Sequence, residues 1–114
     1  MDIKDIIKSS LEESALFNSE ASVDNDLIVA LSKASDLLIE TFSSKGKILL
    51  AGNGGSAADC QHIAAEFMGR LNFDRDPLPA IALTANTSNL TCIANDYGYE
   101  EIFTRQMYAL ANEN

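Results

Sequence analysis

A glycine-rich turn between a short apolar run and a helical segment constrains the fold more than any other part of the sequence. The run KILLA at 47–51 is followed by GNGGS at 52–56 and then by a helical segment that reaches about Gly69. A continuous apolar strand of this length is typical of a parallel sheet that is buried on both faces. The pattern therefore predicts a strand, a turn and a helix, the repeating unit of α/β folds.

Two amphipathic helices are expected before this strand. Apolar side chains recur at three- and four-residue steps over residues 2–17, which predicts the first helix. The second should begin near Asp24 or Asp26 and end at 43–46, where Gly46 suits a left-handed C-terminal cap. We expect both stripes to pack on the core or against another subunit. The stripes consist of Ile3, Ile6, Ile7, Leu11 and Ala15, and of Leu27, Ile28, Leu31, Ala34, Leu38 and Phe42.

Two further strands and a last helix are expected in the carboxyl half. The runs AIALT at 80–84 and LTCIA at 90–94 are predicted as strands, and residues 99–111 as a helix. The order predicts a Rossmann-like α-β-α sandwich with a parallel sheet, preceded by the helical pair within residues 1–45. Three strands would leave an apolar sheet edge uncovered, so residues 1–114 are expected to form a single partial domain, incomplete at the carboxyl end.

Charge and composition exclude several classes of partner. Eight Lys and Arg against seventeen Asp and Glu give a net charge of -9, without a basic block for phosphate backbones, so nucleic acid is not expected as a partner. No apolar stretch is long enough for a signal peptide or a membrane span, which favours a cytoplasmic protein. The two cysteines, Cys60 and Cys92, are too few for a disulfide framework and are expected to be free thiols.

The glycine turn lies at the carboxyl end of a predicted strand, where open α/β sheets bind ligands. Glycines allow close approach of a ligand, and Ser56 could cap the helix and offer a hydroxyl. The amides of a helix start attract anions such as a sugar phosphate. The spacing differs from a dinucleotide fingerprint and the Lys of a P-loop is missing, so a purely structural turn is the alternative.

His62 and Glu66 are candidate site residues on the predicted helix. An i, i+4 pair projects from one helix face, so both side chains can converge on one ion or one substrate. Imidazole nitrogen and carboxylate oxygen are ligands that Zn²⁺ accepts, but two ligands do not complete a site. His62 is the only histidine of the chain, so other ligands must come from elsewhere. The alternative is a solvated pair on an exposed helix face.

Two long segments resemble the SIS (sugar isomerase) domain family and, within it, the phosphoheptose isomerases. They are AGNGGSAADCQHIAAEFMGR at 51–70 and AIALTANTSNLTCIANDYGYEEIFTRQ at 80–106, and the two leading helices occur in the right order. The resemblance implies an aldose-ketose isomerase that converts sedoheptulose 7-phosphate into D-glycero-D-manno-heptose 7-phosphate, toward heptose for bacterial surface glycans such as lipopolysaccharide. It also implies a homotetramer with active sites between subunits.

The resemblance implies site residues as well. His62 and Glu66 match zinc ligands, one ion per subunit, and Glu66 also matches a catalytic acid/base. The sequence stops before the serine- and threonine-rich loop that would bind the substrate phosphate and before a later Gln and His, so these residues alone are not expected to form a competent enzyme. The positions that match substrate contacts are Asn53, Gly54, Gly55, Ser56, Glu66, Asn95 and Asp96.

The competing hypothesis is a binding module. One SIS-domain relative is a non-enzymatic regulator that binds the replication initiator DnaA, and it shares the glycine loop and the histidine but lacks a carboxylate at the position of Glu66. The presence of Glu66 favours the isomerase. A sugar-phosphate-sensing domain of a larger regulator or amidotransferase would need extra domains.

Overall fold

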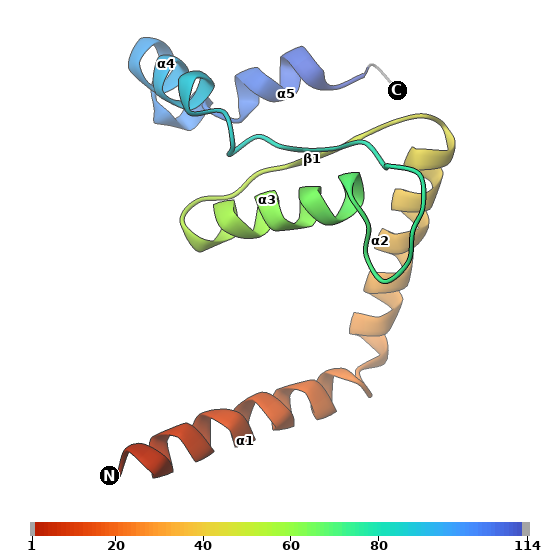
Figure 1. The fold of residues 1–114 in the computed structure, drawn as a ribbon, viewed down its shortest axis with the longest axis vertical. Helices are drawn as coiled ribbons and strands as arrows, with labels where there is room; N and C mark the ends of the chain where they lie inside the picture. Colours follow the sequence, from red (N-terminus) through yellow and green to blue (C-terminus); the bar gives the residue numbers. More distant parts are fainter. Residues whose placement is uncertain (1, 113–114) are drawn as a thin grey trace. The chain divides into compact units, whose positions relative to one another are not determined.

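The computed structural model describes residues 2–112 and divides into two compact units, one through Ile39 and one from Glu40 onward. The first unit contains α1 (Ile3–Ala21) and most of α2 (Asn25–Ser43). The second contains the end of α2, β1 (Ile48–Leu50), α3 (Gly55–Met68), β2 (Ala80–Ala82), α4 (Thr87–Tyr97), the 3-10 helix η1 (Tyr99–Glu101) and α5 (Thr104–Leu110) (Figure 1).

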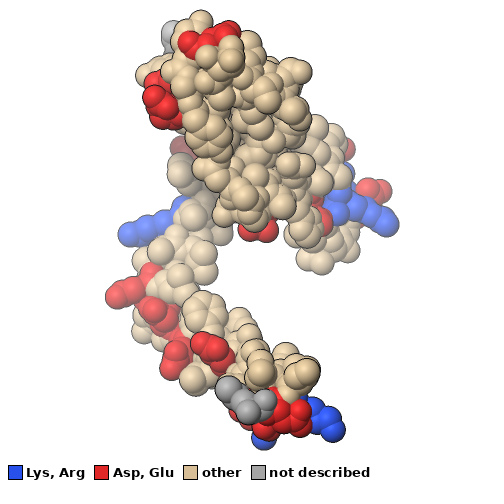
Figure 2. All heavy atoms as spheres, turned by 90° about the vertical axis from the view of Figure 1, so that its left-hand side faces the viewer, with Lys and Arg blue, Asp and Glu red and all other residues tan. Residues whose placement is uncertain are grey.

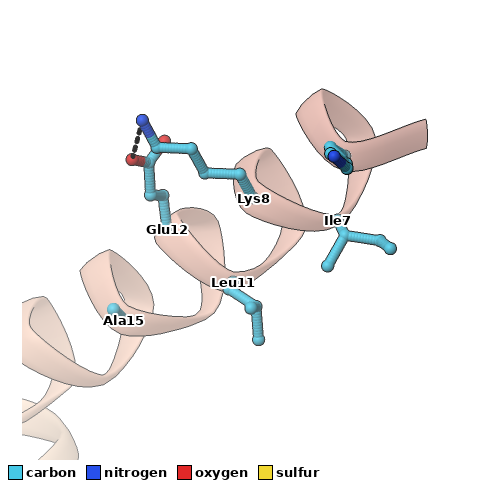
Figure 3. Close-up of a pocket in the computed structure, with 6 residues that line it drawn as sticks. Ile7, Lys8, Leu11, Glu12 and Ala15 are labelled. Carbon is cyan, nitrogen blue, oxygen red and sulfur yellow. Dashed lines mark ion pairs between the residues drawn. The ribbon is translucent and has the colours of Figure 1, made fainter. Parts of the chain in front are cut away.

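Helix α1 is amphipathic and extends to Ala21, beyond the end predicted at residue 17. Figure 3 shows Ile7 and Leu11 on one side of the helix and Lys8 and Glu12 on another, where the Nζ and Oε1 atoms of the charged pair lie 3.7 Å apart. Among the described residues, none of α1 or α2 is buried within the chain. The stripe of α1 is present but is exposed in this structure. At the end of the second stripe, Leu38 and Phe42 are half-buried, and the Phe42 ring centroid lies 5.4 Å from that of Phe67 in α3.

Helix α2 begins as predicted and ends in a different way. The Asp24 carboxylate accepts a hydrogen bond from the backbone N–H of Leu27 at 3.0 Å, which is an N-cap. At the other end, Lys45 and not Gly46 adopts the left-handed conformation, with φ 61°. The Gly46 N–H donates to the carbonyl of Thr41 at 2.7 Å, the long bond of a Schellman motif, and a Cβ on Gly46 would lie 2.8 Å from that oxygen. Glycine is needed at 46 for close approach.

The second unit is built on a parallel pair of strands joined through α3. The register pairs Ile48 with Ala80, Leu49 with Ile81 and Leu50 with Ala82, and α3 packs on both strands. Figure 1 draws α3 on one side of the extended segments and α4 and α5 on the other. The strand, turn, helix and strand at 48–82 agree with the predicted mixed α/β fold and its parallel sheet. The buried apolar residues are Cys60, Ala64, Ala80, Leu83 and Ile102.

The strand predicted at 90–94 is wrong, because these residues lie in α4. The Asn86 side chain caps this helix by accepting from the N–H of Asn89 at 3.0 Å. The inner side chains follow helical spacing, since Leu90, Ile93 and Ala94 are half-buried while Thr91 and Cys92 are exposed. A five-residue apolar run fits the two-residue period of a strand as well as the 3.6-residue period of a helix. Here the cap in front of the run favours the helix.

The helix predicted over residues 99–111 is divided into η1 and α5. Ile102 lies between them and is 3% exposed. The buried Gln106 of α5 fixes this region, because its Nε2 donates to the carbonyls of Leu83 at 2.9 Å and of Ile102 at 2.8 Å. The carboxyl-terminal helices are thus attached to the end of β2 by a buried polar side chain.

Among the described helices, none combines the length and the apolar character needed to cross a membrane. On the face drawn in Figure 2, Asp and Glu side chains occur at many places and Lys and Arg side chains at fewer. This distribution follows from a chain in which acidic residues outnumber basic ones by seventeen to eight.

Candidate active site

The glycine turn connects the carboxyl end of β1 with the start of α3, and its glycines serve different purposes. Gly54 is the N-cap residue with φ 58°, a conformation that side chains disfavour. A Cβ on Gly52 would lie 2.8 Å from the Cβ of Ser56, so the backbone packs directly on the first turn of α3. A Cβ on Gly55 would meet nothing within 4 Å, which leaves open space beside the helix start.

Ser56 does not cap α3, contrary to the prediction. The N-cap position is occupied by Gly54, and no side chain accepts a hydrogen bond there. The N–H of Ser56 instead donates to the carbonyl of Asn53 at 3.1 Å. Within residues 2–112 its exposed hydroxyl has no hydrogen-bond partner, so it remains accessible to a ligand.

Asn53 contacts a residue that the sequence did not single out. The Tyr99 hydroxyl in η1 donates to Asn53 Oδ1 at 2.6 Å, across 46 positions of sequence. Both side chains are exposed, and the Tyr99 residue keeps 63% of its surface accessible. The contact joins the glycine turn to the segment that follows α4. Only the folded chain reveals it, because nothing local in the sequence pairs the two positions.

His62 and Glu66 come together on one face of α3, as their spacing predicts. The Nε2 atom of His62 lies 3.2 Å from Oε1 of Glu66, and their side chains are 75% and 35% exposed. They border a cavity of about 320 Å³. The other residues that line this cavity are Ile63, Phe67, Leu71 and Arg75. A partly shielded carboxylate beside an imidazole at an apolar cavity can accept and return a proton or bind a metal ion.

The donor pair fits zinc in type and spacing but does not complete a site. Two atoms that share a tetrahedral zinc ion at about 2.0–2.2 Å lie roughly 3.3–3.5 Å apart, which is close to the separation of His62 Nε2 and Glu66 Oε1. No group of three or more His, Cys, Asp or Glu that could hold a metal occurs among the described residues 2–112. At least one further ligand from outside this pair is needed.

Arg75 holds the end of α3 and was also missed by the sequence analysis. Its Nη2 donates to the carbonyl of Glu66 at 2.7 Å, and its Nη1 donates to the carbonyls of Phe67 at 2.8 Å and Asp76 at 3.0 Å. The guanidinium thus satisfies carbonyls that the last helical turn leaves without partners and places a positive charge at the helix C-terminus. Glu66 is therefore carried on a firmly terminated helix.

Asn95 and Asp96 lie in the last turn of α4. The strand predicted at 90–94 would have placed them at a strand end, and that placement is wrong. Asp96 Oδ1 accepts from Asn95 Nδ2 at 2.9 Å, and its Oδ2 accepts from the Cys92 thiol at 3.5 Å. The hydrogen bond to Asp96 and the negative charge of that carboxylate raise the pKa of the Cys92 thiol above its ordinary value. Near neutral pH, Cys92 should therefore carry less thiolate and react more slowly than an unperturbed exposed thiol.

The site residues form three groups in the described part of the chain. No hydrogen bond or ion pair between residues 2 and 112 joins the Asn53–Tyr99 contact, the His62–Glu66 pair and the Asn95–Asp96 pair to one another. The first and third groups are linked by the chain itself, because Asp96 stands three residues before Tyr99.

Comparison with known proteins identifies a family and a set of named relatives. The family model described as "SIS domain" matches residues 16–113. The phosphoheptose isomerase of Burkholderia pseudomallei is 51% identical over 107 residues, which are 94% of this chain and 54% of that protein. The phosphoheptose isomerase of Aneurinibacillus thermoaerophilus is 49% identical over the same shares. The chain thus spans about half the length of the curated relatives it matches.

Solved structures of phosphoheptose isomerases have the same fold as this chain over most of its length. A phosphoheptose isomerase from Francisella tularensis superposes with a TM-score of 0.90 and 35% identity, covering 100% of this chain and 59% of the other. The phosphoheptose isomerase from Neisseria gonorrhoeae gives a TM-score of 0.83 and 40% identity, covering 96% of this chain and 55% of the other.

Proposed function

Since the chain belongs to the SIS domain family, we propose that its protein is a phosphoheptose isomerase, an aldose-ketose isomerase that converts sedoheptulose 7-phosphate into D-glycero-D-manno-heptose 7-phosphate. The observation that carries this proposal is the convergence of His62 and Glu66 on α3, directly after the glycine turn. This pair occurs in a chain whose sequence is 51% identical over 107 residues to a protein named phosphoheptose isomerase. The product would feed heptose synthesis for bacterial surface glycans in the cytoplasm.

Glu66 is proposed as the acid/base of the reaction. The isomerisation moves a proton between two adjacent carbons through an enediol, so one group must take up the proton and return it. The Glu66 carboxylate suits this task because it borders a cavity and is only 35% exposed, so a substrate can reach it while bulk water is partly excluded. The hydrogen-bonding distance to His62 Nε2 fixes the orientation of the carboxylate.

Zinc is the proposed cofactor, one ion per subunit. His62 and Glu66 would hold it together with further ligands, and their donor atoms have a suitable type and separation. When bound, zinc supplies a Lewis acid that polarises substrate oxygens and stabilises the charge that develops on them. The residues of this chain would orient the sugar and move the proton.

Substrate contacts are proposed at the glycine turn and at the end of α4. The turn residues Asn53, Gly54, Gly55 and Ser56 lie at the carboxyl end of β1, where α/β sheets bind ligands, and the Ser56 hydroxyl lacks a partner among the described residues. The pair Asn95 and Asp96 would form the second contact. Two observations support this second contact. Asp96 stands three residues before Tyr99, and the Tyr99 hydroxyl donates a hydrogen bond to Asn53 in the turn.

We propose that residues 1–114 form one partial SIS domain with the helical pair at 1–45, and that the protein assembles as a homotetramer. The family model that matches residues 16–113 and the exposed apolar faces of the two helices support this organisation. Exposed apolar stripes at helical spacing are typical of helices that pack against another subunit. The exposed apolar residues of α1 include Ile3, Ile6, Ile7, Leu11, Leu16 and Phe17.

The regulator hypothesis receives no support from the comparisons. The relatives and solved structures described above are all named phosphoheptose isomerases. The carboxylate at position 66, which favoured the isomerase in the sequence, lies beside His62 at a cavity. A binding module has no need for a proton-transfer group there.

The substitution Glu66→Gln tests the proposed function. It keeps the size of the side chain but removes the proton-accepting carboxylate, so we expect kcat for sedoheptulose 7-phosphate to fall by about 10² to 10⁴-fold. Folding should remain nearly unchanged, because an exposed i, i+4 pair contributes about 0.3–0.5 kcal/mol. The matched control is Glu40→Gln, which changes an exposed carboxylate on another helix. A loss of only a few-fold in the Glu66 variant would contradict the assignment.

A further inference from the structure

The contact between Tyr99 and Asn53 connects the glycine turn to η1. The Tyr99 hydroxyl donates to Asn53 Oδ1 at 2.6 Å, within the range of strong O–H···O hydrogen bonds. The bond is long-range in sequence, since Asn53 and Tyr99 are 46 positions apart. Because no local segment joins the two residues, the geometry of this hydrogen bond depends on how firmly the backbone of each residue is held.

The Tyr99 side is held by a turn and a buried anchor. Gly98 ends α4 with φ 108°, and its N–H donates to the carbonyl of Ala94 at 3.2 Å. Ile102 then closes η1 through its N–H, which donates to the carbonyl of Tyr99 at 3.3 Å, and its own side chain is 3% exposed. The backbone of Tyr99 is thus fixed on both sides, although its ring is exposed.

The Asn53 side is held by the start of α3. The carbonyl of Asn53 accepts from the N–H of Ser56 at 3.1 Å, and the preceding Gly52 packs so closely on Ser56 that no Cβ would fit. These contacts fix the backbone of Asn53 and leave its side-chain torsions as the remaining freedom. The Tyr99 hydroxyl restrains those torsions.

We propose that Tyr99 is a positioning residue that turns the Asn53 carboxamide so that its NH₂ group faces the ligand. A carboxamide has one acceptor oxygen and an NH₂ group with two donors, and Tyr99 occupies the oxygen. With the oxygen turned toward Tyr99, Asn53 presents its two N–H donors to the ligand, which favours an oxygen acceptor, such as a hydroxyl, carbonyl or phosphate oxygen of a sugar phosphate. The identity of this ligand rests on the proposed function.

Kinetics and binding with three variants test the proposal on the protein isolated in its natural length. Tyr99→Phe removes the hydroxyl and keeps the ring. We expect Kd and KM for sedoheptulose 7-phosphate to rise about 3- to 10-fold with kcat unchanged, because the Asn53 carboxamide is no longer held in place and its hydrogen bond to the ligand is weakened. Tyr108→Phe is the control, since this tyrosine is 86% exposed and lies outside the site. Asn53→Asp keeps an acceptor for Tyr99 but removes the NH₂ donors, so it should weaken binding more than Tyr99→Phe.

A double-substitution cycle separates positioning from general stability. If Tyr99 acts through Asn53, the pair Tyr99→Phe and Asn53→Ala should bind no more weakly than Asn53→Ala alone. Additive losses would overturn the proposal, as would a Tyr99→Phe protein whose Kd and KM equal those of the wild type.

A spectroscopic readout keeps this inference distinct from the proposed function. In ¹⁵N-labelled protein, the Asn53 side-chain NH₂ resonances should shift in Tyr99→Phe and stay unchanged in Tyr108→Phe. Titration with sedoheptulose 7-phosphate in the same spectra gives Kd without turnover. Two results together would refute the isomerase and leave the positioning role intact. They are a wild-type protein that binds the sugar without isomerising it, and weaker binding of the sugar by Tyr99→Phe. Unshifted Asn53 resonances in Tyr99→Phe would overturn the positioning role.

Discussion

At the scale of single residues, neighbours decide which polar groups can react. Cys92 is exposed on α4, yet its Sγ donates to Asp96 Oδ2 at 3.5 Å. That hydrogen bond, the charge of Asp96 and a smaller effect of desolvation raise the pKa of the thiol above its ordinary value, while Arg105 opposes them. Because the thiolate is the nucleophile, the thiol should react slowly until the pH exceeds this raised pKa.

The substitution Asp96→Asn tests this local effect. Removing the carboxylate removes the main cause of the raised pKa, so more thiolate is present at pH 8 and alkylation of Cys92 by iodoacetamide should become several-fold faster. Peptide mass spectrometry gives the rate at Cys92 separately from the buried Cys60. Asp74→Asn changes an exposed carboxylate elsewhere and should leave the rate unchanged. Equal rates in the wild type and Asp96→Asn would contradict the prediction.

Residues with a local pattern were predictable, and residues with distant partners were not. The i, i+4 spacing of His62 and Glu66 was enough to predict that they meet. The partners of Asn53 and of the α3 carbonyls, Tyr99 and Arg75, depend on tertiary structure that no local pattern encodes. Ser56 was predicted to cap α3 because serine favours the N-cap position. In the structure Gly54 occupies that position, with a positive φ that glycine readily adopts.

At the scale of secondary-structure elements, the end of α3 supports the candidate site. The carbonyls of the last turn face the Arg75 guanidinium, which donates to those of Glu66 and Phe67 at 2.7 and 2.8 Å. The N–H of Leu78 also donates to the Phe67 carbonyl, at 3.0 Å. The loop after α3 therefore closes the helix from which Glu66 projects.

Arg75→Ala should destabilise the protein. It removes partly buried, charge-assisted hydrogen bonds and a favourable charge at a helix C-terminus, so we expect the free energy of unfolding to fall by about 1.5–3 kcal/mol. The matched control is Arg70→Ala, an exposed arginine just after the same helix, for which a change within about 0.5 kcal/mol is expected. Urea denaturation measures both. Equal midpoints for the two variants would contradict the capping role of Arg75.

The carboxyl half shows why one element was predicted wrongly. The run at 90–94 is apolar enough for a buried strand, but the inner positions Leu90, Ile93 and Ala94 also fit a helix, and Asn86 supplies the cap that starts it. The strand at 80–82 was predictable because a loop with two prolines precedes it and a turn-rich segment follows it. The glycine turn before α3 was predictable because three glycines separate an apolar run from a helical segment. Short apolar runs without such neighbours are ambiguous between strand and helix.

At the scale of the whole molecule, many large apolar side chains of the described residues are exposed. The large apolar side chains of α1 are exposed, and the sheet of the second unit has two strands. The chain also spans about half the length of the relatives it matches. The exposed apolar side chains agree with the proposal that the protein works as an assembly, because contact with another subunit would remove them from water.

The most direct test of the central claim is the conversion of sedoheptulose 7-phosphate by the protein isolated from its own cell, with zinc present and followed by NMR. The proposed function predicts that the ketose signals decline while those of D-glycero-D-manno-heptose 7-phosphate appear. It also predicts that a chelator stops the conversion and that added zinc restores it. A correctly folded, zinc-supplied protein that leaves sedoheptulose 7-phosphate unchanged would contradict the claim.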